Sequence, residues 1–256
     1  MTVHFIGAGP GAADLLTVRG VKLIKAAPVC VYAGTYVPAE VLALCPAGAL
    51  LIDSARLDLD QITEQLIAAH RRGQDVARLC SGDPSLYSAV AEQARRLDRA
   101  GVPWDITPGV PAYAAAAALL GRELTVPGVT QTVILTRAQR DSTPMPPSES
   151  LAALARSHAT LVLHLAIRQT RKLAAVLAAE YGPDCPAVVV ADATGPAELV
   201  LTGTLADIAD QVEAAGLRQA AVIMVGEVFR ARGFGESHLY GRRERPGSGP
   251  TRRVTS

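Results

Sequence analysis

The first half of the chain alternates short apolar runs, rich in β-branched residues, with segments of helical pattern. The runs VHFIG, PVCVYAG, ALLID, DVARLCSG and VPWDITPG are predicted to be strands, and helices are predicted near residues 15–26, 59–73 and 86–101. An alanine-rich helix should follow Pro111. Such alternation is typical of right-handed crossovers that build a parallel sheet with helices on its faces. We therefore predict an N-terminal α/β domain over residues 1–121.

The second half has a different texture. A loop and a strand in LTVPGVTQTVILTR precede DSTPMPPSES, whose Pro and Ser content excludes a regular element. Strands are predicted in ATLVLHLAI, CPAVVVADAT, ELVLTGTL and AAVIMVGEVF, with a helix ending at Tyr181 and another near residues 206–215. Two of these strands are separated only by DATGPA, which is a hairpin-like spacing. We therefore expect a second α/β domain with a mixed sheet over residues 122–241. The basic, Gly/Pro-rich residues 242–256 are predicted to be disordered.

Composition excludes several classes of protein. A chain of 256 residues with 49% hydrophobic content can bury one large core or two medium ones. Its net charge of +1 gives no general attraction to nucleic acid or to a membrane. The start MTVHFIGAG lacks the basic region of a signal peptide, and no apolar stretch reaches the roughly 18 residues needed to span a bilayer. We expect a cytoplasmic protein.

Metal and disulfide chemistry have no support in the pattern of Cys and His residues. The scattered cysteines have no C-x-x-C spacing, so in a reducing compartment they are interpreted as core or near-surface thiols; they are Cys30, Cys45, Cys80 and Cys185. Four histidines form no ligand spacing, and we predict no metal site; they are His4, His70, His158 and His238.

A glycine loop, GAGPGAA, follows the first predicted strand at residues 7–13. It satisfies the dinucleotide pattern G-x-G-x-x-A, which would make the chain a nucleotide-dependent oxidoreductase. Two details oppose that interpretation. Pro10 lacks a backbone N–H that would face a pyrophosphate, and the second strand ends in Tyr32, Ala33 and Gly34 without an acid for a ribose. A tight turn against another ligand is favoured.

Two further motifs, SGDPSLY at residues 81–87 and TPGVPAY at residues 107–113, also follow predicted strands. The carboxyl ends of parallel strands are where α/β proteins bind small molecules. Asp83 either contacts a ligand or caps the helix whose first turn contains Pro84. The TPGVPAY segment is either an ordinary turn or a surface for a flat ligand. Together these motifs predict a pocket made largely of backbone.

The three motifs resemble the tetrapyrrole-type (class III) S-adenosylmethionine-dependent methyltransferases, and the resemblance covers nearly the whole chain. Within that family, VYAGTYVP, LTVPGVTQTVILTRAQ, the STPMP segment, ATLVLHLAI and ESHLY are similar to the branch that methylates precorrin-4 at C-11. The uroporphyrinogen-III branch typically has an Asp after the tyrosine of the second strand, where this chain has Ala33. The resemblance implies formation of precorrin-5 on the route to cobalamin. The alternatives are another precorrin or uroporphyrinogen-III C-methyltransferase and, more remotely, an oxidoreductase or a non-catalytic binding protein.

The resemblance also implies a cofactor site in the cleft between the domains. S-Adenosyl-L-methionine, converted to S-adenosyl-L-homocysteine, would contact residues in both domains; they are Pro10, Ser81, Gly82, Asp83, Leu86, Pro111, Ala112, Leu165, Ala193 and Ala221. The precorrin-4 members of the family usually have an aromatic and basic stretch where this chain reads ADATGPAE, so of the contacts there only Ala193 is carried over. Methyl transfer in line with the sulfonium needs mainly proximity and alignment, so no catalytic base is demanded and none is assigned.

The implied substrate is a polycarboxylate tetrapyrrole, and the implied assembly is a homodimer. Basic side chains should bind the carboxylates, and Arg137 is favoured because it ends a strand; the candidates are Arg19, Lys22, Arg122, Arg137 and Arg140. Tyr87 and Tyr113 either contact the macrocycle or pack in a core. His164, within an apolar run, is interpreted as a satisfied buried histidine and not as a base. Whether the substrate carries cobalt is left open.

Overall fold

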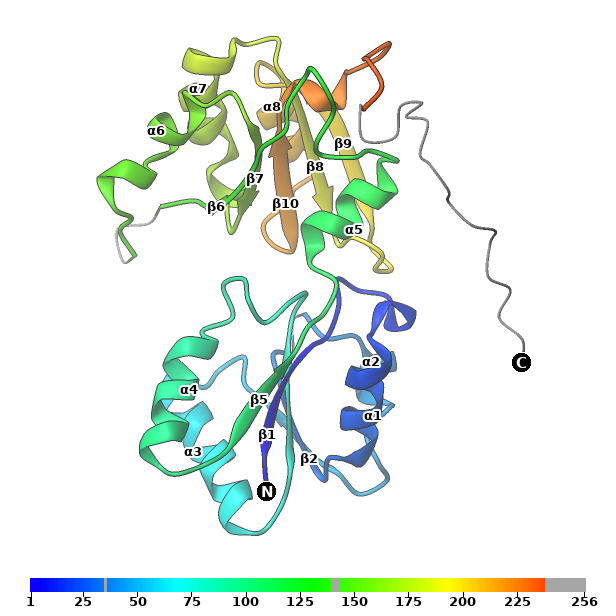
Figure 1. Ribbon diagram of the computed structural model, residues 1–256, viewed down its shortest axis with the longest axis vertical. Helices are drawn as coiled ribbons and strands as arrows, with labels where there is room; N and C mark the ends of the chain where they lie inside the picture. Colours follow the sequence, from blue (N-terminus) through cyan, green and yellow to red (C-terminus); the bar gives the residue numbers. More distant parts are fainter. Residues whose placement is uncertain (35, 140–142, 238–256) are drawn as a thin grey trace, which may run out of the picture.

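The computed structural model describes residues 1–34, 36–139 and 143–237, which form two α/β domains, each built on its own sheet (Figure 1). The predicted disordered tail, Arg140 and His238 lie outside the described residues. Within the described part of the chain, no helix combines the length and apolar character needed to cross a membrane.

The first sheet has five parallel strands, as predicted. Their order is β3-β2-β4-β1-β5, and the strands are β1 (Val3–Gly7), β2 (Val29–Tyr32), β3 (Leu50–Asp53), β4 (Val76–Cys80) and β5 (Trp104–Thr107). This order differs from the 3-2-1-4-5-6 arrangement of dinucleotide-binding sheets. The glycine loop after β1 therefore lies beside the ends of β4 and β5, in a setting unlike that of a dinucleotide loop.

Helices cover both faces of this sheet, and its inner strands are therefore buried on both sides. One core packs α1 (Val18–Ala26) and α2 (Ala39–Leu42) against the sheet and includes Leu79. The opposite core packs α3 (Leu59–Arg71) and α4 (Val90–Arg99) and includes Phe5. The two helix pairs flank the sheet in Figure 1.

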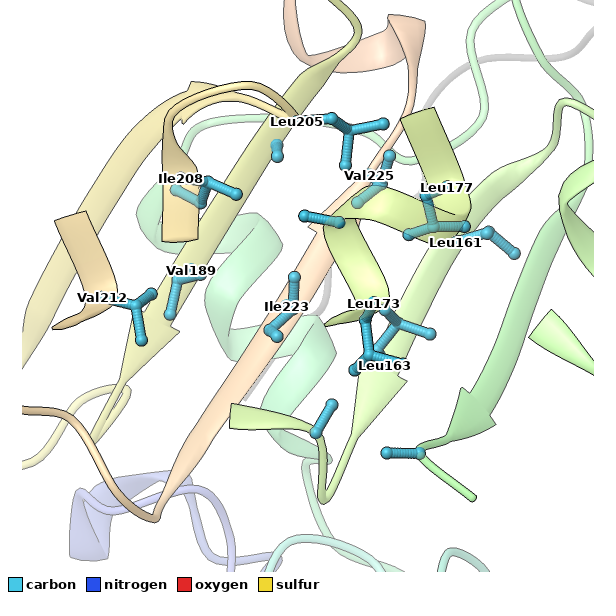
Figure 2. Close-up of a cluster of buried hydrophobic side chains, with 14 of the residues drawn as sticks. Leu161, Leu163, Leu173, Leu177, Val189, Leu205, Ile208, Val212, Ile223 and Val225 are labelled. Carbon is cyan, nitrogen blue, oxygen red and sulfur yellow. The ribbon is translucent and has the colours of Figure 1, made fainter. Parts of the chain in front are cut away.

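The second sheet is mixed, as predicted. Its order is β6-β7-β10-β8-β9, and its strands are β6 (Val133–Arg137), β7 (Thr160–His164), β8 (Pro186–Ala191), β9 (Leu199–Thr204) and β10 (Ala221–Val225). Strands β6 and β7 are parallel, whereas β10 runs antiparallel to β7 and β8, and β8 to β9. One face is covered by α6 (Leu151–Ala155), α7 (Thr170–Tyr181) and α8 (Ile208–Ala214). Figure 2 shows the buried side chains of that core.

Helix α5 (Ala112–Leu119) covers the other face of the second sheet. Its Ala115 and Ala116 pack in one core with Val162 of β7 and Met224 of β10, and Figure 1 shows the helix lying along this sheet. Helix α5 ends before residues 121 and 122, between which the domain boundary is predicted. The position of that boundary stays a prediction. The chain thus passes from the first sheet to the second within the TPGVPAY motif, whose last two residues begin α5.

Two predicted helices begin later than expected. The helix predicted from residue 86 starts at Val90, because Tyr87 and Ala89 have left-handed φ values of 55° and 51°. The helix predicted from residue 15 starts at Val18, where Thr17 accepts a hydrogen bond from the Gly20 amide, and a short 3-10 turn (Ala13–Leu15) precedes it. The other 3-10 turns are Pro147–Glu149, Ile167–Gln169 and Glu227–Phe229.

Candidate functional site

The loops that follow β1, β4 and β5 meet at one edge of the first sheet, because these strands are neighbours. The Gly9 amide donates to the Gly82 carbonyl at 3.2 Å, and the Gly82 amide donates to the Gly9 carbonyl at 2.8 Å. A Cβ atom on Gly7 would lie 2.5 Å from the Cα atom of Gly109. A Cβ atom on Gly82 would lie 3.4 Å from the Cα atom of Pro111. The three predicted motifs therefore form one backbone junction, and glycine is required for the approach of β1 to the loop after β5.

Asp83 braces this junction. Its Oδ2 atom accepts the Gly109 amide at 2.8 Å, and its Oδ1 atom accepts both the Ser85 amide at 2.8 Å and the Ser85 hydroxyl. Burial alone would raise the pKa of the Asp83 carboxyl, but the hydrogen bonds from Ser85 and Gly109 outweigh it and hold that pKa below its ordinary value. Because α4 begins only at Val90, Asp83 does not cap that helix. Its contact with a ligand stays a prediction.

The second domain meets the junction with the loop after β8. A Cβ atom on Gly11 would lie 2.8 Å from the Ala193 carbonyl oxygen, and the Ala12 amide donates to Thr194 Oγ1 at 3.0 Å. The Asp192 amide donates to the Ala220 carbonyl at 2.8 Å, next to the start of β10. The predicted cofactor residue Ala193 is thus brought to the glycine loop that carries Pro10, and Ala221 follows Ala220, whose carbonyl pairs with the loop after β8.

Residues with strained backbone conformations are concentrated where the two domains contact each other. The non-glycine residues with positive φ include one pair before α4 and a set at the facing edge of the second sheet; they are Tyr87, Ala89, Leu165, Asp192, Thr194 and Ala220. Among the described residues, His158 is the other such position, at the opposite end of β7. Sparsely populated backbone conformations persist where surrounding structure holds them and cluster at functional sites.

A cleft of about 810 Å³ opens between the domains beside the junction. The first domain lines it with residues of the loop before α4, with the start of α4 including Glu92, and with Trp104 and Ile106 of β5. The second domain lines it with Arg137, Thr143 and Leu165. This volume is within the range of small-molecule pockets, roughly 300–1,000 Å³. Three of the predicted site residues, Tyr87, Arg137 and Leu165, line the cleft.

The remaining predicted residues do not line this cleft. Most of the proposed cofactor contacts surround the backbone junction or its flanking loops; they are Pro10, Ser81, Gly82, Asp83, Leu86, Pro111, Ala112, Ala193 and Ala221. Tyr113 instead packs against the core between α5 and the second sheet. Arg19 and Lys22 are exposed on α1, and the Arg122 guanidinium donates to the Ala231 carbonyl at 3.3 Å. Of the described cationic candidates, Arg137 alone reaches the cleft.

Arg137 and Tyr87 face each other across the cleft from different domains. The Arg137 guanidinium donates to the carbonyls of Thr143 at 3.1 Å and Pro144 at 3.4 Å, and no carboxylate of the described residues pairs with it. Burial raises the pKa of the Tyr87 phenol, and the charge of Arg137 partly opposes that shift. The pair therefore offers a cation and a neutral hydroxyl donor to a ligand.

His164 ends β7 between two tyrosines. Its ring centroid lies 5.4 Å from that of Tyr87 in the first-domain loop and 6.5 Å from that of Tyr113 on α5. The Nε2 atom is buried and has no hydrogen-bond partner among the described residues. The prediction of a satisfied buried histidine is therefore wrong for this atom, because no described residue provides it with a hydrogen bond and its neighbouring rings pack tilted and edge-on against the imidazole. The signal in the sequence that could have indicated a site residue here is the position of a single histidine at the end of a predicted strand.

Comparison with known proteins identifies the class. The model of the tetrapyrrole (corrin/porphyrin) methylases matches residues 2–209, and the chain belongs to this family. A precorrin-4 C(11)-methyltransferase from Rhodococcus erythropolis is 60% identical over 240 residues, which cover 94% of this chain and 96% of the relative. The predicted family is thereby confirmed.

Solved structures agree with the fold. The chain resembles a cobalt precorrin-4 methyltransferase with a TM-score of 0.86 and 38% identity, covering 89% of this chain and 95% of the other. It also resembles a Thermus thermophilus uroporphyrin-III C-methyltransferase complexed with S-adenosyl homocysteine, with a TM-score of 0.76 and 29% identity, covering 90% and 99% of the two chains. The predicted arrangement of a parallel and a mixed sheet is confirmed.

Proposed function

We propose that this chain transfers a methyl group from S-adenosyl-L-methionine to C-11 of precorrin-4, giving precorrin-5. The observation that carries the proposal is the junction at which Gly9 and Gly82 pair while Gly11 abuts Ala193, beside an interdomain cleft. The 60% identity to a precorrin-4 C(11)-methyltransferase supports the choice of substrate.

The junction suits a sulfonium cofactor. Of the side chains predicted to contact it, Asp83 is the only charged one, and its oxygens are already hydrogen-bonded within the loops. The remaining contacts are backbone groups and apolar walls, which fit an adenine and a thioether better than a pyrophosphate. When bound, the cofactor supplies an electrophilic methyl group. The residues of the chain hold it and align it with the cleft.

The cleft suits a large, flat polycarboxylate. Ile106 and Leu165 are exposed there by 46% and 54%, so both offer apolar surface to a macrocycle. Arg137 offers a guanidinium for a carboxylate, and this is the pairing for which Arg is best shaped. We place the substrate against these residues, with the reacting carbon toward the glycine junction.

A cytoplasmic homodimer belongs to the same proposal. It is supported by the family resemblance, and sedimentation of the purified chain tests it. A single monomeric species at micromolar concentration would refute the dimer.

The experiment that tests the function is incubation of the purified chain with methyl-¹³C-labelled S-adenosylmethionine and, separately, precorrin-4 or uroporphyrinogen III. We expect one labelled methyl at C-11 of precorrin-4, assigned by NMR. Labelling of uroporphyrinogen III alone would favour the sister activity. A thermal shift with NADPH and none with S-adenosylhomocysteine would favour an oxidoreductase, because a ligand that binds the native state raises its stability by mass action.

A further inference from the structure

We propose that His164 is the acid–base residue of this site: its Nε2 atom accepts the proton that a pyrrolic N–H of the bound tetrapyrrole must release during methyl transfer. This inference rests on the proposed function and assigns the proton acceptor that the sequence left unassigned.

His164 lies against two of the predicted contact segments, SGDPSLY and TPGVPAY, and precedes the predicted contact residue Leu165. Tyr87, whose ring centroid is 5.4 Å away, follows the SGDP loop directly, and Tyr113, at 6.5 Å, follows Ala112. Leu165, the next residue in the chain, lines the cleft with a left-handed φ of 51°. His164 is not itself among the residues that line the cleft, but its neighbours Tyr87 and Leu165 are.

The unpaired Nε2 atom points to a ligand. Buried polar atoms in native proteins almost always have a hydrogen-bond partner, because leaving one unpaired costs free energy. A phenylalanine would fill the space between the two tyrosine rings without that cost. The described residues supply no partner for Nε2, so its hydrogen-bonding capacity is unused in the structure.

The surroundings keep the imidazole neutral. The titratable or charged groups that face it are Tyr87 from the loop before α4, Tyr113 from α5 and Arg137, its register partner on β6. Strand β10 contributes only apolar residues. Burial lowers the pKa of His164, so at neutral pH one ring nitrogen carries a lone pair that can accept a proton.

The reaction gives such an acceptor a role beyond proximity and alignment, because a proton must leave the macrocycle. Transfer breaks the carbon–sulfur bond, leaving its electron pair on sulfur, and forms a carbon–carbon bond from a π pair of the macrocycle. The macrocycle then carries a positive charge delocalised onto a ring nitrogen. Loss of that nitrogen's proton to Nε2 restores neutrality, and the resulting imidazolium returns the proton to solvent after product release.

The test compares His164→Phe and His164→Gln with His158→Gln. The His158 ring centroid lies 5.3 Å from that of Tyr181 with the rings tilted by 49°, but His158 is exposed and does not line the cleft, so it is a matched control. We expect His164→Phe to unfold at a temperature no lower than the parent and to bind S-adenosylhomocysteine within about 3-fold of it. Its kcat should fall by roughly 10²–10⁴-fold, as is typical when a general base is removed.

The pH profile separates catalysis from packing. In the parent, only neutral imidazole accepts the proton, so kcat should fall as the pH drops through the lowered pKa of His164. That acid limb should vanish in both His164 variants and persist in His158→Gln. A His164→Phe enzyme with kcat within about 3-fold of the parent, or with the same acid limb, would overturn the proposal.

A second readout does not depend on turnover. The chain has five histidines, so ring-¹⁵N-labelled protein gives few signals and His164→Gln assigns the one of interest. Adding precorrin-4 together with S-adenosylhomocysteine should shift the Nε2 signal toward that of a hydrogen-bonded nitrogen. An unchanged signal on saturation would refute contact with the tetrapyrrole. Failure of the parent to methylate precorrin-4 would instead refute the proposed function, which these spectra do not require.

Discussion

The Oδ2 atom of Asp83 accepts the backbone amide of Gly109 in a hydrogen bond of 2.8 Å, which ties the loop after β4 to the loop after β5. The two residues are 26 positions apart in the chain, and β1 lies between their strands in the sheet. This contact fixes the entrance of α5 relative to the glycine loop. The shape of the proposed cofactor site therefore depends on a carboxylate that need not touch the cofactor.

Asp83→Ala should lower both stability and cofactor affinity. Hydrogen bonds to a charged group contribute roughly 1.5–3 kcal/mol, so we expect the free energy of unfolding to fall by about 2–3 kcal/mol. The dissociation constant of S-adenosylhomocysteine, measured by calorimetry, should rise by about tenfold or more. The control is Asp60→Ala, which removes an exposed ion pair with Arg96 and should cost less than about 1 kcal/mol. Unchanged affinity in Asp83→Ala would remove this residue from the site.

The contribution of Asp83 should depend on pH with a defined sign. Its pKa in the folded chain lies below that of an unfolded Asp, about 3.9. The ionised carboxylate therefore stabilises the fold above that value, and the stabilisation is lost as the pH falls through the lower, folded pKa. Urea unfolding of the parent and of Asp83→Ala should give a difference that is constant near neutral pH and shrinks below about pH 4. A difference that grows on acidification would contradict the assignment.

Gly109→Ala should damage the fold more than an ordinary glycine substitution. The added Cβ would collide with the Gly82 carbonyl oxygen and lie 2.7 Å from the Cα atom of Gly7, and backbone atoms cannot rotate away. We expect a loss of about 3 kcal/mol or more, at the upper end for overpacking. Gly101→Ala is the control, because its φ of 68° is strained but nothing lies within 4 Å. It should cost only about 1–2 kcal/mol, and equal losses in denaturant unfolding would show that the junction tolerates movement.

Thr194→Val should loosen the contact between the domains. It removes the acceptor for the Ala12 amide at 3.0 Å while keeping the shape of the side chain. We expect about 1 kcal/mol of lost stability and faster hydrogen exchange at the Ala12 amide. Thr125→Val, which removes only an exposed bond to Glu123, is the control and should leave that exchange rate unchanged.

Arg137→Ala should weaken substrate binding and spare cofactor binding. Loss of a charged hydrogen-bonding partner corresponds to roughly a 10–150-fold fall in kcat/KM for the tetrapyrrole. Arg137→Lys should recover part of it, since the charge remains but the bidentate geometry does not. Arg171→Ala, on the exposed side of α7 with Asp210 and Glu213, serves as the control. A larger effect on S-adenosylhomocysteine affinity than on kcat/KM would place Arg137 in the other site.

The sequence predicts the strands well because their signal is local. Continuous apolar runs such as PAVVVA and AVIMV are buried strands in the structure, and the DATGPA segment joins two antiparallel strands. Helix starts were less predictable near the site. The turn at residues 83–88 resembles a helix start in sequence, but Asp83 is hydrogen-bonded to Gly109, a contact that no local pattern contains.

The least predictable features depend on contacts between the domains. Helix α5 is uniformly alanine-rich, so its sequence does not indicate that it packs on the second sheet. The role of His164 could not be read from its apolar neighbours either, because Tyr87 and Tyr113 reach it from other parts of the chain. The site residues that were expected from the family resemblance do gather at one interdomain region, although they divide between a junction and a cleft.

We propose that the methyl donor binds between the two sheets, held mainly by backbone around Gly82 and Ala112. A crystal structure of the chain grown with S-adenosylhomocysteine tests this binding site. We expect density for the thioether product at the junction of the loops after β1, β4 and β5, with hydrogen bonds to main-chain atoms of those loops. Density at a different place, or a junction closed by side chains at saturating ligand, would contradict it.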